Sequence, residues 1–228
     1  MIRWWGGVVW ALVAAIAVAV ALEALLVGDA VGGARVAGGP GVTTSGLRLN
    51  EILAGPARDW DGDGVYDSKG DEWLEVQNTG PVSLAIEEYR LTDADHTVRM
   101  ALSGTLGPGE VKLVTGSAAV AWQRSLGLTT AGLSLNNAGD TIYLLHVAGA
   151  DTAVVDSHAY GSIEGGSDRS VGHASTQSED WILFDSLNRY LGSGTPPGSG
   201  CAPTPGGANG CTTDVSATTW GAIKRLYR

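Results

Sequence analysis

The chain has 228 residues, a formal net charge of −10 at neutral pH and 34 glycines. This length fits one domain of ordinary size with short appendages, and the many glycines indicate short strands joined by turns. The acidic balance argues against a nucleic-acid partner, because binding to phosphates needs a basic face. It suits solubility and divalent cations instead.

The N-terminal segment, residues 1–27, is predicted to be a hydrophobic helix. Arg3 precedes an uncharged run over residues 4–22, and a helix of that length spans about 28 Å, close to the thickness of a bilayer core. It is either a cleaved signal peptide or an uncleaved membrane anchor. We favour the anchor, because the run is long for a signal peptide and its cleavage site is indistinct. In both cases the rest of the chain is exported.

A flexible linker rich in glycine and alanine is predicted over residues 28–46, and strands follow it. The first strand alternates imperfectly: Leu47, Leu49, Glu51 and Leu53 are predicted on one face, with Asn50 and Ile52 on the other. The predicted strands are residues 47–53, 73–77, 89–92, 97–102, 110–114, 141–145, 153–156 and 181–184. Such short strands with regular turns predict an all-β sandwich.

The acidic stretch DWDGDGVYDSKGDEW, residues 59–73, predicts a calcium site. Its first half matches the D-x-[DN]-x-[DN]-G pattern of a calcium loop. The predicted metal ligands are Asp59, Asp61, Asp63, the carbonyl of Val65, Asp67, Asp71 and Glu72. Gly70 occupies the position where such loops carry a bidentate glutamate, so Asp71, Glu72 or water must replace that ligand. The alternative is a solvated turn in which the aspartates cap their own backbone.

Two regions between and after the strands are less regular. Residues 118–126 form either one helical turn or a covering loop, and residues 192–210 are predicted to be irregular because they are rich in Gly, Pro and Ser. Cys201 and Cys211 are predicted to form a disulfide in an oxidising compartment, the alternative being two free thiols.

The C-terminal tail, residues 212–228, is predicted to be a short amphipathic helix. Trp220, Ile223 and Tyr227 recur at helical spacing beside basic residues. The tail either docks on the domain, frays, or acts as a recognition element for an export or envelope component.

Four motifs in order resemble the bacterial lamin tail domains. They are the opening LNEIL with the later DEWLEVQN (residues 49–78), GLSLNNAGDTI (132–142), VDSHAYG (155–161) and TPGGAN (204–209). The resemblance covers residues 47–211. It implies an immunoglobulin-like β-sandwich that binds or supports other molecules without a catalytic centre, on exported bacterial proteins. An acidic calcium loop is common among bacterial members of the family without defining it.

No catalytic motif is apparent in the sequence. It contains no G-x-S-x-G elbow, H-E-x-x-H pair or phosphate loop. Glu164, Asp168 and Arg169 lie in a glycine-rich loop, where they either contact a ligand or are solvated at the surface, and we expect the second. The GLSLNNAGD segment is expected to be a structural turn.

Three functions therefore compete. The first is a non-catalytic, calcium-stabilised module of the cell envelope, held to the membrane by its N-terminal helix and bound to an unidentified protein or envelope component. The second is a metal-dependent, nuclease-like hydrolase that uses the acidic loop. The third is an accessory protein delivered to a secretion or surface apparatus by its C-terminal helix.

Overall fold

The computed structural model describes residues 46–210. The predicted N-terminal helix and C-terminal amphipathic helix, together with almost all of the predicted linker, lie outside these residues. Within the described range, no helix has the length and apolar character needed to cross a membrane.

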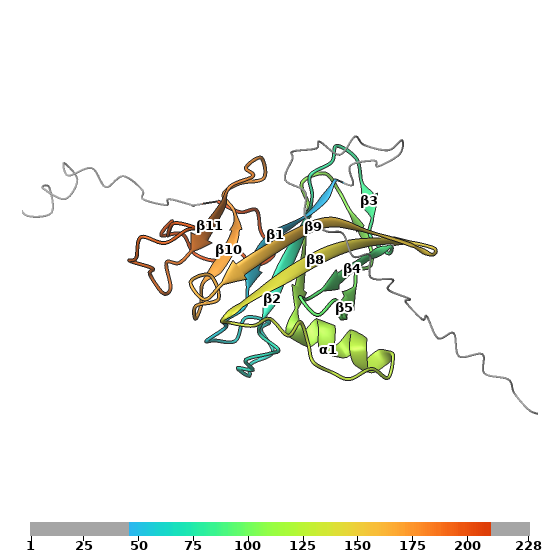
Figure 1. The fold of residues 1–228 in the computed structure, drawn as a ribbon, viewed down its shortest axis with the longest axis horizontal. Helices are drawn as coiled ribbons and strands as arrows, with labels where there is room; N and C mark the ends of the chain where they lie inside the picture. The colour runs from blue at the N-terminus through green and yellow to red at the C-terminus, as the bar shows by residue number, and fades with distance from the viewer. Residues whose placement is uncertain (1–45, 211–228) are drawn as a thin grey trace, which may run out of the picture. The chain divides into compact units, whose positions relative to one another are not determined.

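Eleven strands and one helix make up the described part of the chain (Figure 1). They are β1 (Leu47–Leu53), β2 (Trp73–Asn78), β3 (Leu84–Ala85), β4 (Tyr89–Thr92), β5 (Val98–Ala101), β6 (Thr105–Leu106), β7 (Val111–Thr115), α1 (Gly116–Ser125), β8 (Gly139–Ala148), β9 (Asp151–Gly161), β10 (Ser170–His173) and β11 (Trp181–Phe184). Each of the eight predicted strands is present, and the irregular course predicted for residues 192–210 is confirmed.

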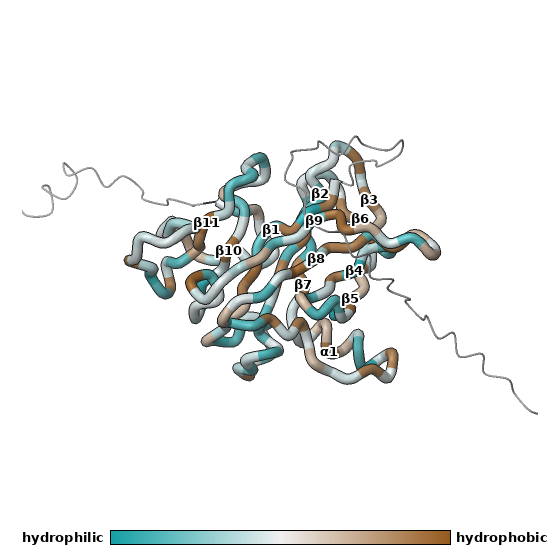
Figure 2. Tube along the Cα trace, viewed as in Figure 1, coloured by the Kyte–Doolittle hydropathy of each residue, from teal (hydrophilic) through white to brown (hydrophobic). Residues whose placement is uncertain are grey.

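Two antiparallel sheets form the layers of a sandwich. The five-stranded sheet has the order β11-β10-β1-β2-β7, the four-stranded sheet has the order β5-β4-β8-β9, and β3 pairs with β6 separately. A core between the layers takes Leu49, Leu74 and Val76 from the first sheet, and Leu91 and Leu144 from the second. Figure 2 shows the hydrophobic residues gathered mainly along the strands and the hydrophilic residues mainly in the connections. The predicted all-β sandwich is confirmed.

A β-bulge explains the imperfect alternation of β1. The pairing with β2 passes from Leu49–Val76 directly to Glu51–Glu75, so Asn50 is the extra residue. The bulge moves Ile52 onto the same core as Leu49. The predicted assignment of all odd-numbered residues to one face is therefore wrong beyond Leu49.

Several elements differ from the prediction, and the two-residue strands β3 and β6 were not predicted. The ambiguous residues 118–126 belong to a ten-residue helix, α1, which is capped by the Thr115 hydroxyl accepting from the Ala118 N–H at 3.2 Å. Strands β8 and β9 are longer than predicted and form a hairpin whose two-residue turn has Gly149 at a φ of 63°. Strand β10 was not predicted, because its four buried residues carry no alternation.

The second face of the five-stranded sheet is buried too, beneath the irregular closing segment of residues 199–209. Glu51 and Glu75 are fully buried partners across β1 and β2. Glu51 accepts hydrogen bonds from the hydroxyls of Ser170 and Thr204, and Glu75 accepts from the Gly206 N–H. Burial, with Glu51 as the second cause, raises the pKa of Glu75 to about 8.

Candidate metal site in the acidic loop

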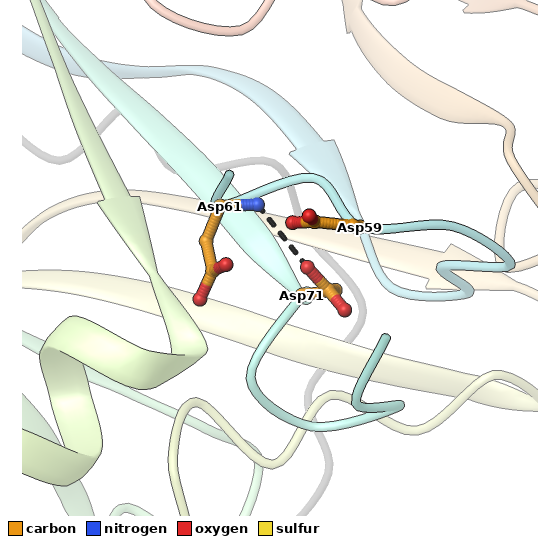
Figure 3. A group of neighbouring side chains, drawn as sticks. All are labelled: Asp59, Asp61 and Asp71. Atoms are coloured by element: carbon orange, nitrogen blue, oxygen red, sulfur yellow. Dashed lines mark hydrogen bonds between the residues drawn. The ribbon is translucent and has the colours of Figure 1, made fainter. Parts of the chain in front are cut away.

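Three aspartates of the loop between β1 and β2 converge (Figure 3). One carboxylate oxygen from each of Asp59, Asp61 and Asp71 lies within 4.8 Å of the other two. Asp59 is exposed, whereas Asp71 is 1% exposed and stands two residues before β2. The candidate site therefore lies at an edge of the sandwich. Asp71 is held next to the sheet, and the other two aspartates lie on the loop.

The carboxylate of Asp71 ties the two halves of the loop together. Its Oδ1 accepts from the N–H groups of Trp60 at 2.6 Å and Asp61 at 3.1 Å, and its Oδ2 accepts from Asp67 at 2.7 Å. Hydrogen bonds from several backbone N–H groups hold an ionised carboxylate in place. Asp71 therefore keeps the loop closed while its negative charge faces the two other aspartates.

The loop also contains the self-capping turns of the alternative interpretation. Asp59 accepts from the N–H groups of Gly62 at 2.7 Å and Gly64 at 2.8 Å, and Asp63 accepts from Val65 at 2.7 Å. Gly62 and Gly64 have φ values of 78° and 89°, which suit glycine. These turns shape the loop, and the convergence of the three carboxylates is an additional feature.

The remaining predicted ligands lie elsewhere. Asp63 and Asp67 are exposed and do not belong to the converging group, and the Oδ1 of Asp67 accepts from the Lys69 N–H. Val65 lies at the exposed tip. Glu72 is 4% exposed and accepts from the Leu135 N–H at 3.1 Å, and burial raises its pKa to about 8. Of the two substitutes predicted for the ligand missing at Gly70, the structure brings Asp71 to the group.

A brace from a distant loop holds the acidic loop against the domain. Asp168 accepts from the Ala57 N–H and from the indole N–H of Trp60, both at 2.9 Å, and its carboxylate pairs with Arg58 at 3.0 Å. The residue is 7% exposed with a φ of 51°. The expectation of surface solvation is wrong for Asp168. No local pattern signals this role, because its partners lie about 110 residues away.

Only one of the two cysteines of the predicted disulfide lies in the described residues. Cys201 is buried at 6% exposure, and no cysteine of the described range is a free thiol. Cys211 lies outside the described residues, so its pairing with Cys201 stays a prediction.

The fold and the loop define a sandwich module of the immunoglobulin-like class. The family model described as Lamin Tail Domain matches residues 42–162, and the chain belongs to the lamin tail domain family. No match was found among curated proteins. Strands β10 and β11 follow the matched range, yet β10 pairs directly with β1 and completes the same sheet.

Proposed function

We propose that this protein is a non-catalytic binding or structural module of the cell envelope whose acidic loop is stabilised by calcium. The family is one of non-catalytic immunoglobulin-like domains, which supports the first half of the proposal. The convergence of Asp59, Asp61 and Asp71 within 4.8 Å carries the second half.

The argument for calcium is electrostatic. Two carboxylates at this separation repel by about 1–3 kcal/mol per pair at effective dielectric constants between bulk water and a protein surface. A hard cation converts that repulsion into attraction, and calcium accepts the mixture of carboxylates, carbonyls and water that an irregular loop offers. Magnesium is less suited, because it demands near-octahedral geometry and keeps its own water.

Thermal unfolding of the full-length protein tests the calcium proposal. An extracellular type of site with a dissociation constant of about 10⁻⁴–10⁻³ M stabilises by roughly 0.4–1.4 kcal/mol at millimolar calcium. This corresponds to a rise of about 1–5 °C in the melting temperature. Asp61→Ala should abolish the rise, since it removes one of the converging carboxylates.

Asp180→Ala is the matched control, because Asp180 is exposed and lies outside the acidic loop. This variant should keep the calcium shift of the wild type. A shift that survives Asp61→Ala, or a melting temperature that calcium and chelator leave unchanged, would contradict the proposal.

The location is proposed from the sequence of the N-terminal segment. The hydrophobic run of residues 4–22 supports anchoring in the membrane, and secretion follows if it is cleaved. Intact-mass spectrometry of the protein recovered from its native membrane fraction should give the uncleaved chain, less 2 Da for a Cys201–Cys211 disulfide. Recovery of the intact, reduced chain from the cytoplasmic fraction would contradict export.

A further inference from the structure

A cluster of aromatic rings joins the two sheets, apart from the acidic loop. The imidazole of His158 on β9 stacks on the indole of Trp181 on β11, with ring centroids 3.6 Å apart and an angle of 14° between the planes. His173 on β10 contacts the same indole, at a centroid distance of 4.5 Å. Because β9 is the edge strand of the four-stranded sheet and β11 that of the five-stranded sheet, the stack is a direct contact between the layers.

One ring nitrogen of His158 lacks a partner in this stack. Its Nε2 is buried and makes no hydrogen bond. The Oε1 of Glu164 lies 3.5 Å away, beyond the usual length of a hydrogen bond, and the two side chains are only 13% and 11% exposed. Buried polar atoms nearly always have a hydrogen-bond partner, so this nitrogen points to a second state in which it is paired.

The carboxylate of Glu164 is already fixed opposite that nitrogen. Its Oε2 accepts from the Gly161 N–H at 2.6 Å, which leaves Oε1 to face His158. The sequence predicted a solvated side chain at this position, and that expectation is wrong for Glu164 as well. A carboxylate that is held in place loses little conformational freedom when it forms an ion pair.

Two carboxylates favour a positive charge on His158. Glu164 faces the ring from the connection between β9 and β10. Asp156 lies on β9 itself and accepts from the Leu49 N–H of β1 at 2.8 Å. Burial raises the pKa of Asp156, and a charged His158 counters that rise. A protonated His158 would form a charge-assisted hydrogen bond with Glu164 and a cation–π contact with Trp181.

The other charged groups near the rings do not prevent this. Burial, with Arg48 as the second cause, lowers the pKa of His173 to about 4, so His173 stays neutral at physiological pH and does not repel its neighbour. Arg48 on β1 and Glu179 in the connection between β10 and β11 lie 3.5 Å apart as an ion pair, so their charges largely offset each other. The response of the cluster to pH therefore falls to His158, since histidine ordinarily changes charge between roughly pH 5 and 8.

We propose that His158 forms a pH-dependent link between the two sheets. Protonation gives Nε2 a positively charged N–H, which binds the Oε1 of Glu164 as a buried ion pair while the ring stays stacked on Trp181. Loss of the proton ends the ion pair. Because the pair exists only in the folded state, it stabilises the domain as the pH falls from about 8 to 5.5. The link uses no metal, so it is independent of the proposed function.

Chemical denaturation of the full-length protein at pH 5.5 and pH 8 tests this link. Glu164→Gln keeps an acceptor for the Gly161 N–H and removes the charge. It should lower the folding equilibrium constant about tenfold more at pH 5.5 than at pH 8, as expected for one hydrogen bond to a charged group. In a His158→Gln background the same substitution should have equal effects at both pH values. Glu75 is unchanged in these variants, so its own pH dependence cancels.

Glu88→Gln is the matched control. Glu88 pairs with His146 at 3.1 Å, but this pair is exposed and screened by solvent. Its loss should therefore change the folding equilibrium constant by less than about threefold at either pH.

Tryptophan fluorescence gives a second readout that does not require unfolding. A charged imidazole quenches an indole on which it stacks, so the emission of the folded protein should fall between pH 8 and pH 5.5. The fall should be lost in His158→Gln. His96 and His146 lie against tyrosines instead of tryptophans.

Three results would overturn the proposal. The first is an equal effect of Glu164→Gln at pH 5.5 and pH 8. The second is a pH-dependent effect of Glu164→Gln that persists in the His158→Gln background, because the proton would then belong to another group. The third is a fluorescence change between the two pH values that is the same in the wild type and in His158→Gln.

Discussion

Asp71 and Glu75 lie four residues apart and serve different purposes. Asp71 ends the acidic loop and accepts three backbone N–H groups, so its charge is held at the edge of the sheet. Glu75 points to the buried face beneath the closing segment, where its partner across the strands is Glu51. Burial raises the pKa of both glutamates. Asp71 is therefore a candidate ligand for a cation, whereas the carboxyl group of Glu75 belongs to the packing of the fold.

The raised pKa of Glu75 predicts a pH dependence of stability. In the folded state its pKa is about 8, against the usual 4.5. Between these values the folded state binds more protons than the unfolded state, so the free energy of unfolding falls as pH rises from about 4.5 to 8. Glu51 on β1 adds to this slope, and His173 on β10, whose pKa burial lowers to about 4, opposes it below pH 6.5.

Urea unfolding of wild type and Glu75→Gln between pH 5 and pH 8 measures this slope. The variant cannot ionise at position 75, so its stability should change less over that range. Its stability at pH 5 should be lower by about 1 kcal/mol, because an amide nitrogen replaces one hydrogen-bond acceptor. Parallel pH profiles for the two proteins would contradict the assignment.

Local spacing predicted the residues of the metal site only in part. Asp59 and Asp61 meet as the spacing of the calcium loop implies, and Asp71, one of the two predicted substitutes for Gly70, lies in the same group. Asp63 is exposed and lies outside this group, and its carboxylate accepts from the Val65 N–H two residues on. Asp168 was missed, because its role depends on segments that only the folded chain brings together.

At the scale of elements, the closing segment fastens the five-stranded sheet. Asn209 donates to the backbone carbonyls of Asn50 at 3.1 Å and His173 at 2.9 Å, and it accepts from the side chain of Asn50 at 2.7 Å. These partners belong to β1 and β10. The TPGGAN motif at the end of the domain is therefore hydrogen-bonded to the β-bulge at Asn50, near its beginning.

Loss of the hydrogen bonds of Asn209 should destabilise the domain. Asn209→Ala takes away hydrogen bonds at a position that is 7% exposed and leaves buried partners unpaired, so the free energy of unfolding should fall by about 2–4 kcal/mol. Asn137→Ala is the control, since Asn137 is exposed. Chemical denaturation measures both variants, and equal stabilities would show that the closing segment contributes nothing to the sheet.

Strands with an apolar pattern were predictable, including β2, all six residues of which are buried, whereas a strand without such a pattern was not. The segments at 89–92 and 181–184 agree with β4 and β11 in full. Strand β10 was not predicted, because Ser170, Gly172 and His173 are buried by the closing segment and form no apolar pattern. Helix α1 was ambiguous, because only Gly116, Ala119 and Gln123 of its ten residues are buried.

At the scale of the molecule, one sandwich supports two distinct features. The acidic loop connects β1 to β2, and the closing segment covers the outer face of the five-stranded sheet. Membership in the lamin tail domain family accounts for the sandwich. The acidic loop is the surface at which we propose that this envelope module binds calcium.

Hydrogen exchange of the full-length protein tests the central claim most directly, because it reads the acidic loop itself. With a dissociation constant of about 10⁻⁴–10⁻³ M, 10 mM calcium should slow exchange of the amides over residues 59–71 by about 10- to 100-fold relative to chelator. The amides that donate to Asp59, Asp61 and Asp71 should show the largest change. Identical exchange of this loop with calcium and with chelator would contradict the account.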